Sequence, residues 1–267
     1  MYKTIELDTL ESVIQLVSEQ EFSDKTKRHR SNFMYHGLSN ISFELTTSLQ
    51  RNCKQLYPEL ESSILRNFTK YALAEYPWLD GSVWKQMILG QHHGLPTRLL
   101  DWTYSPLTAL HFATTENNLD KMGRHDCVVW KIDIEEIHTT LPQKYYDVLH
   151  NENALIFTVE MLDKIAHDAA KYDRDMGTDS MVIIEPPSID PRIINQYSYF
   201  SVVPTGMSVE KFLAENTKNT VKYVIKKELR WRIRDMLDQL NINERTVYPG
   251  LDGLSKWLAR HYYVKDE

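Results

Sequence analysis

Hydrophobic residues recur every three or four positions in several segments of the chain, a spacing typical of helices with one buried face. Ahead of the first such segment, Asp8 and Glu11 form a candidate cap pair. Ser82 and Pro106 stand where the N-terminal cap and the first turn of two later helices are expected. The predicted helices span residues 9–20, 64–72, 83–93, 106–113, 159–169, 233–240 and 254–261.

Shorter apolar runs bounded by turn residues predict strands. The clearest run lies at 127–132, and another at 181–184 is closed by Pro186 and Pro187. The predicted strands span residues 33–35, 98–102, 127–132, 181–184, 193–203 and 222–225. Because helices and strands are mixed along the chain, with no repeat and no linker, we expect a single α+β domain.

The segment 91–106, with the sequence QHHGLPTRLLDWTYSP, combines titratable and hydroxyl side chains with glycine and proline. Glycine readily adopts the left-handed backbone conformation found just after a helix. Gly94 therefore predicts that the preceding helix ends near His93. His92 and His93 then lie at a helix C-terminus, where the helix dipole favours the charged imidazolium.

Two interpretations of this segment remain open. Polar groups on a backbone pinned by prolines are held in fixed positions, as a binding or catalytic site requires. The alternative is a structural hydrogen-bond network in which Arg98 and Asp101 form an ion pair.

Composition narrows the class of protein. The chain has 267 residues, of which 42% are hydrophobic and 25% charged, as in folded globular proteins. Cys53 and Cys127 are too few for a zinc site with four cysteine ligands. Such low cysteine usage is typical of proteins in a reducing compartment. With no apolar signal core and no run of about 18 apolar residues, we expect a cytoplasmic protein without membrane contact. The net charge of −6 argues against nucleic-acid binding by the whole surface. The basic stretch 222–234 is either a solvated face or a local docking surface for nucleic acid or an acidic partner.

Four segments resemble the FRG domain family. They are the tripeptide Tyr35-His36-Gly37, the run TSLQR at 47–51, the block 91–113 and the run RIINQYSYF at 192–200. The resemblance extends from residue 33 to the C-terminus and includes the tail at 248–254. It implies an N-terminal helical segment at 1–30 and an FRG domain at 31–267. One departure is His36, where the family usually has arginine.

The FRG layout in turn resembles the ADP-ribosyltransferase fold. Tyr35-His36-Gly37 is similar to the His-Gly motif that ends the first strand of diphtheria-toxin-like enzymes, and 99–106 matches the order of their second motif. The third motif usually holds a glutamate, a position that Gln196 or Glu185 would fill. The resemblance implies a split, mixed β-sheet flanked by helices, with NAD as substrate. It also implies a toxin or defence effector that modifies nucleic acid or protein, with an antitoxin or chaperone as a possible partner.

The resemblance assigns roles to particular side chains. His36 would hydrogen-bond a ribose beside Gly37, and Arg98 would bind the pyrophosphate. The ring that stacks on nicotinamide would be that of Trp102, Tyr104 or Tyr35. The expected catalytic residues are His36, Gln196, Asp101 and Glu185. The expected NAD-binding residues are Tyr35, Gly37, Thr47, Ser48, Arg51, His92, His93, Arg98, Trp102, Thr103 and Ser105.

Cleavage of the nicotinamide–ribose bond passes through an oxocarbenium-like state that a carboxylate stabilises. Gln196 can donate or accept a hydrogen bond but carries no charge, so Asp101 or Glu185 would supply the carboxylate. We therefore expect His36, Arg98 and Asp101 to converge in one cleft.

Three alternatives stay open. A non-catalytic module would bind a nucleotide without turning it over, and an NAD glycohydrolase would use water as the acceptor. A metal site would combine His36, His92, His93 and Asp101. Adjacent histidines on a helix project to different sides, which disfavours the metal site.

Overall fold

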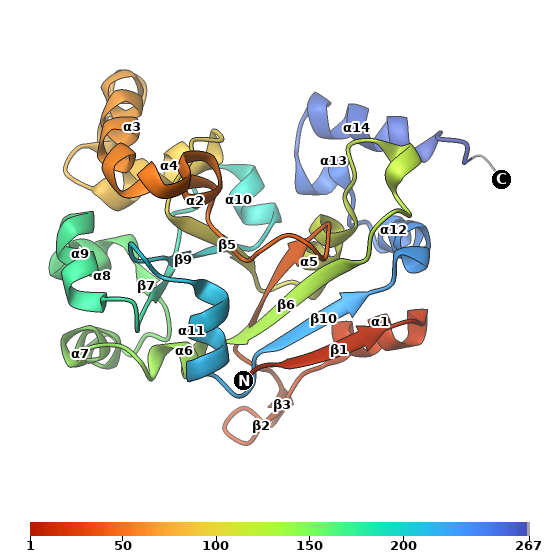
Figure 1. The fold of residues 1–267 in the computed structure, drawn as a ribbon, viewed down its shortest axis with the longest axis horizontal. Coiled ribbons are helices and arrows are strands. Elements are labelled where there is room, and N and C mark those ends of the chain that lie inside the picture. Colours follow the sequence, from red (N-terminus) through yellow and green to blue (C-terminus); the bar gives the residue numbers. More distant parts are fainter. Residues whose placement is uncertain (266–267) are drawn as a thin grey trace.

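The computed structural model describes residues 1–265 and contains one mixed eight-stranded sheet flanked by helices (Figure 1). The strands, in spatial order, are β1 (Lys3–Leu7), β10 (Val221–Ile225), β6 (Cys127–Asp133), β4 (Phe33–Leu38), β5 (Leu99–Thr103), β9 (Ser198–Val202), β8 (Val182–Glu185) and β7 (Phe157–Thr158). The pairs β1–β10 and β7–β8 are parallel and the other neighbours are antiparallel. The expected α+β class with a mixed sheet is confirmed.

The sheet is nearly divided between β4 and β5. These two strands pair only at Tyr35 and Thr103, whereas β4 pairs with β6 along the whole range from Phe33 to Leu38. β5 pairs with β9 over its full length. Two four-stranded halves therefore meet at one point, and the strands diverge beyond it.

Helices cover the first half of the sheet on both faces. α1 (Leu10–Ser18), α5 (Pro106–Thr114) and α12 (Arg230–Gln239) bury a core on one face, and α6 (Ile134–His138) and α11 (Val209–Asn216) pack on the other. α5 lies directly against β4, because a Cβ on Gly37 would stand 2.1 Å from the carbonyl oxygen of Ala109. Only glycine allows this contact, so the close backbone approach at Gly37 is to a helix of the fold.

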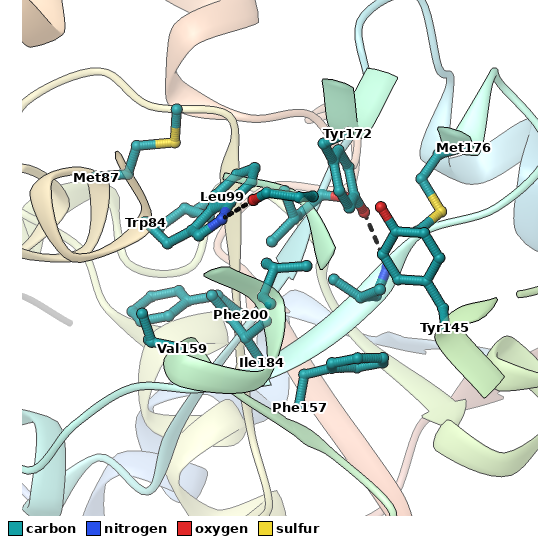
Figure 2. Packing of buried hydrophobic residues seen from close by; sticks show 14 of the residues in the cluster. Trp84, Met87, Leu99, Tyr145, Phe157, Val159, Tyr172, Met176, Ile184 and Phe200 are labelled. Atoms are coloured by element: carbon teal, nitrogen blue, oxygen red, sulfur yellow. Dashed lines mark hydrogen bonds between the residues drawn. The ribbon is translucent and has the colours of Figure 1, made fainter. Parts of the chain in front are cut away.

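The second half packs against helices gathered at the left of Figure 1. They are α3 (Tyr57–Ala72), α4 (Val83–His92), α7 (Gln143–Asn151), α8 (Val159–Ile165) and α9 (Ala169–Met176). Figure 2 shows the buried aromatic residues of this core. The Tyr172 hydroxyl donates to the Val202 carbonyl at 2.7 Å and accepts from the Val182 amide at 3.0 Å, which ties α9 to β8 and β9. Trp84 Nε1 donates to the Ala166 carbonyl at 2.7 Å.

The remaining elements complete the fold. The α-helices are α2 (Ser48–Cys53), α10 (Pro191–Asn195), α13 (Glu244–Val247) and α14 (Leu251–His261). A small hairpin is formed by β2 (Phe22–Ser23) and β3 (Arg28–His29). The 3-10 turns are η1 (Lys54–Leu56), η2 (Pro77–Leu79), η3 (Leu119–Lys121) and η4 (Lys227–Leu229). No helix within residues 1–265 combines the length and the apolar character needed to cross a bilayer.

Several predicted helix ends are confirmed. The Ser82 hydroxyl caps α4, Gly94 follows the helix with a φ of +85°, and Pro106 opens α5. The cap of α1 was predicted wrongly, because Thr9 and not Asp8 is the capping residue, and its side chain pairs reciprocally with Ser12.

The strand predicted at 193–203 is wrong in its first half. Asp190 caps the Arg192 amide and Pro191 occupies the first turn, so these residues form α10. Tyr197 then adopts a φ of +49°, and the strand begins only at Ser198.

Other elements were not predicted at all. The segment 133–180 holds four helices where one was expected, and the N-terminal segment contributes β1 to the main sheet as well as a helix. Four of the five β1 residues are exposed, so no apolar run marked this strand.

Candidate functional site

A cavity of about 690 Å³ opens where β4 and β5 diverge. Its walls come from the ends of these two strands, the loop that follows β4, the start of α2, the end of α5, and α10 with the residues after it. Of the expected site residues it gathers Tyr35, His36, Gly37, Ser48, Arg51, Asp101, Trp102, Thr103 and Gln196.

His36 is fixed across the divide between the two halves of the sheet. Its Nδ1 lies 2.6 Å from the backbone carbonyl oxygen of Asp101. A carbonyl oxygen only accepts, so Nδ1 carries the proton and Nε2 keeps its lone pair. Trp102 packs edge-on against the imidazole with ring centroids 5.7 Å apart, and the indole is itself held by a 3.0 Å bond from Nε1 to the Ser201 hydroxyl. The ring therefore has a defined orientation and tautomer at the cavity wall.

The electrostatic surroundings keep this imidazole neutral. Burial lowers the pKa of His36, and the nearby Arg51 guanidinium lowers the pKa further. The carbonyl bond and the carboxylate of Asp101 act in the opposite direction but do not outweigh burial. At neutral pH the Nε2 atom is therefore a hydrogen-bond acceptor.

Gln196 joins three elements at the cavity wall. Its backbone carbonyl accepts a 2.7 Å bond from the Thr103 hydroxyl, and its side-chain nitrogen donates to the Val247 carbonyl at 3.2 Å. The residue is only 9% exposed. The prediction that it lies on a strand is wrong, because it directly follows α10. Among the described residues no hydrogen bond occupies its Oε1 atom.

Two arginines at the cavity remain available to an anion. Arg51 donates to the backbone carbonyl of Thr46. Arg192 lies over the Tyr248 ring, 5.0 Å from its centroid, and makes a long 3.4 Å bond to the His92 carbonyl. Within residues 1–265 neither guanidinium forms an ion pair with a carboxylate. The sequence resemblance includes Arg192 in the run at 192–200 but does not predict that it binds an anion.

The carboxylates at the cavity differ from the expected pair. Asp101 lines the cavity with an exposed side chain, as expected, and Glu44 and Glu116 join it from two loops. Glu185 was predicted wrongly, because it projects from the end of β8 beside Tyr104 and outside the cavity. Glu44 and Glu116 were not predicted from the sequence, because each lies in an irregular segment outside the motifs that resemble known families.

Arg98 is the main correction among the expected site residues. It is 5% exposed, and its guanidinium is held by Glu61, with Nε 2.6 Å from one carboxylate oxygen, and by Asp173 at 2.6 Å. It lines a second cavity, not the one that holds His36, and it forms no ion pair with Asp101. His36 and Asp101 converge as expected. Arg98 is oriented away, because Glu61 and Asp173 accept hydrogen bonds from its Nε, Nη1 and Nη2 atoms.

The adjacent histidines also lie outside the cavity. His92 Nε2 is 3.4 Å from Asp190, and His93 is exposed. The expected charge on His92 is not favoured, because burial lowers its pKa more than Asp190 raises it. No group of three possible metal ligands occurs among residues 1–265. The proposed set of His36, His92, His93 and Asp101 is therefore not assembled.

The hydroxyl residues divide between capping and the cavity. Thr47 and Ser105 cap α2 and α5 and do not line the cavity. Ser48 does line it, and its hydroxyl accepts from the Thr97 amide at 3.1 Å.

Aromatic side chains at the cavity include two that sequence reasoning missed, Phe43 and Phe112. The Tyr35 ring lies in the core beneath α5, 1% exposed, and burial raises the pKa of its hydroxyl. Trp102 is equally buried, at 2% exposed, so Phe43 and Phe112 are better placed than either to contact a ligand.

The basic stretch at 222–234 does not form a continuous charged surface. Arg230 and Arg234 are buried, and Arg234 is paired with Glu244. Lys226 lies 2.9 Å from Glu6 on the neighbouring strand. Of the six basic residues in the stretch, Lys227 and Arg232 are exposed.

Comparison with known proteins identifies one family. The FRG domain model matches residues 31–122, a range that includes β4, α2, β5 and α5. Neither a curated protein nor a solved structure matches the chain. The matched residues supply His36, Arg51 and Asp101 to the cavity. Residues 31–122 therefore match the FRG domain, in agreement with the resemblance seen in the sequence.

Proposed function

We propose that the cavity binds NAD and that the protein is an ADP-ribosyltransferase-like enzyme. The observation that carries this proposal is the placement of His36. Its imidazole is locked by the Asp101 carbonyl at the point where the sheet divides, and no hydrogen bond within residues 1–265 occupies its Nε2 at the cavity wall. A neutral imidazole in this position accepts a hydrogen bond from a ribose hydroxyl.

The shape and charge of the cavity suit a dinucleotide. A volume of about 690 Å³ lies in the range of small-molecule and cofactor sites. Arg51 and Arg192, with no carboxylate partner in the described chain, would bind the two phosphates through charge-assisted hydrogen bonds. Phe43 and Phe112 offer apolar ring surface for nicotinamide or adenine.

The proposed reaction breaks the bond between nicotinamide and C1′ of its ribose. Nicotinamide leaves as a neutral molecule with the bonding electron pair, and an acceptor atom bonds to C1′ and passes its proton to a carboxylate or to water. Positive charge develops on the ribose during this step. Asp101, Glu44 and Glu116 are the carboxylates at the cavity that can stabilise it.

Gln196 supports a second candidate function, that of a non-catalytic nucleotide-binding module. By the resemblance it would fill the position where the third motif carries glutamate, and its amide nitrogen is already used in a bond to Val247. An amide holds a ribose hydroxyl but supplies no negative charge.

The biological setting belongs to the proposal as well. We propose that the protein acts as a toxin or defence effector, that its acceptor is a nucleic acid or a protein, and that an antitoxin or chaperone restrains it. With water as the acceptor the same site would be an NAD glycohydrolase.

Incubation of the purified protein with adenine-labelled NAD and total cell lysate tests these functions together. Label transferred to protein or nucleic acid supports the transferase, and label released only as free ADP-ribose supports the glycohydrolase. Saturable NAD binding in calorimetry without cleavage supports the binding module. Absence of both binding and cleavage at millimolar NAD overturns the proposal.

A further inference from the structure

A second cavity, of about 860 Å³, lies between α3, α4 and α9. It shares no lining residue with the cavity that contains His36. Its volume is within the range of sites that enclose a small molecule. The proposed NAD reaction makes no use of it.

Part of the wall of this cavity is aliphatic, and the rest is polar or charged. Leu65, Leu73, Val83 and Met87 line it, and no aromatic side chain of the described chain does. Met87 and Leu65 belong to the core of the second half of the sheet, and Met87 lies beside Trp84 in Figure 2. A wall without rings suits a flexible hydrocarbon chain better than a planar base, which gains most from aromatic stacking.

The unpaired charges around the cavity are positive. Arg66 and Arg174 are exposed at its edge and have no hydrogen-bond or ion-pair partner within residues 1–265. Lys70 also lies at the edge, 5.5 Å from the Tyr71 ring centroid, and likewise has no acidic partner there.

The acidic residues around the cavity are already engaged. Glu61 and Asp173 both bind Arg98, and Asp173 also accepts from the Thr205 amide at 3.1 Å. Asp168 caps α9 and pairs with His167 at 2.8 Å. The charges left for a ligand are therefore the cations at the edge.

We propose that this cavity binds a medium-chain aliphatic carboxylate. The hydrocarbon chain would lie along the aliphatic wall, and the carboxylate would lie between Arg66, Lys70 and Arg174 at the edge. Burial of the hydrocarbon chain provides the larger part of the affinity. The guanidinium groups select for an anionic head.

Titration calorimetry with decanoate, kept below its micelle concentration, tests the proposal. The double variant Arg66→Gln/Arg174→Gln should bind decanoate at least tenfold more weakly than the unmodified protein. Decan-1-ol, which has the same chain without the charge, should bind both proteins within threefold of each other. The matched control Lys25→Gln/Arg28→Gln removes two exposed cations from the hairpin region and should leave decanoate binding unchanged.

A second variant tests the aliphatic wall. Leu73 is half-buried at the cavity, so Leu73→Trp should fill the space with little effect on the thermal midpoint and should abolish binding of both decanoate and decan-1-ol. The proposal is overturned if the unmodified protein does not bind decanoate. It is also overturned if the arginine double variant binds decanoate as tightly, or if only anionic phospholipid vesicles bind. NAD binding by the same variants should be unchanged, because the two cavities share no residue.

Discussion

At the scale of the residue, the candidate site depends on one side chain held in one tautomer. The bond from His36 Nδ1 to the Asp101 carbonyl orients the ring, and burial keeps it neutral by lowering its pKa. A group fixed in this way loses little freedom when a ligand binds, so its hydrogen bond contributes fully to binding of the transition state.

Replacement of His36 by alanine is expected to remove activity without unfolding the protein. Loss of one positioned hydrogen bond in a site costs about 2–4 kcal/mol of transition-state binding, or roughly a 30- to 1000-fold drop in kcat/KM for NAD. His93→Ala, an exposed histidine outside the cavity, is the matched control and should keep full turnover. A folded His36→Ala protein with unchanged NAD cleavage would show that the histidine has no role in the reaction.

Gln196 separates the transferase from the binding module. Gln196→Glu should retain or raise NAD cleavage, because a carboxylate stabilises the positive ribose and keeps an oxygen for its hydroxyl. Gln196→Ala should weaken NAD binding or turnover. Both variants lose the bond to Val247, so the thermal midpoint is recorded with the rate of cleavage. Parallel losses of stability and activity in both would contradict a role in the reaction and favour the binding module.

At the scale of the element, the position of the cavity follows from how the two halves of the sheet meet. β4 and β5 pair at one residue position, and α5 lies against β4 so closely that Gly37 has no space for a side chain. The end of α5 then brings Phe112 and Glu116 to the cavity. The contact between α5 and β4 thus sets the width of the site.

Gly37→Ala is expected to destabilise the fold strongly. The added Cβ would meet the backbone of Ala109 at 2.1 Å and that of Ala113 at 2.7 Å, and backbone atoms cannot rotate away. A cost of about 3 kcal/mol or more in the free energy of unfolding is expected for such overpacking. Gly123→Ala is the control, because nothing lies within 4 Å of its Cβ position. Equal urea midpoints for the two variants would contradict the close contact.

At the scale of the whole molecule, an ionic network anchors the C-terminal helices next to the cavity. Arg260 binds Glu244 through two bonds of 2.9 and 2.8 Å and also binds Asp238 on α12. Arg234 pairs with Glu244 from another side and lies 2.9 Å from His111 Nδ1 on α5. The network holds α13, whose Val247 carbonyl supports Gln196.

This network predicts loss of stability in acid. Burial, followed by Arg234, lowers the pKa of His111 to about 3. Burial alone would raise the pKa of Glu244, but Arg260 and Arg234 outweigh it and hold the value at about 2. His138, whose ring nitrogen accepts from the Ile183 amide, has its pKa lowered to about 4 by burial.

All three groups bind protons more readily in the unfolded chain than in the folded protein. The contributions of His111 and His138 to the free energy of unfolding are complete above about pH 6.5 and decline below it. The contribution of Glu244 declines below about pH 4.5. The thermal midpoint should therefore be level between about pH 7 and 8 and fall steadily from about pH 6.5 to 4. His111→Gln keeps an acceptor but does not titrate, so its midpoint should depend less on pH between 6.5 and 5. An unchanged pH dependence in this variant would contradict the role of His111.

Features that depend on neighbours within a few residues were predictable from the sequence. The cap at Ser82, the left-handed Gly94 and the first-turn Pro106 follow from local backbone chemistry, and the structure has all three. His36 and Asp101 were identified as candidates because 35–37 and 99–106 resemble two motifs of a known fold, which are local stretches of sequence.

Features that depend on distant partners were decided only by the tertiary structure. Arg98 is bound by Glu61 and Asp173, which lie 37 and 75 positions away, and no local pattern distinguishes such an arginine from one that binds a ligand. The exposed strand β1 exists because β10 supplies its backbone partners. Local hydrogen bonds and periodicity act within a turn or two of chain, whereas ion pairs, strand pairing and cavities arise only where segments remote in sequence pack together.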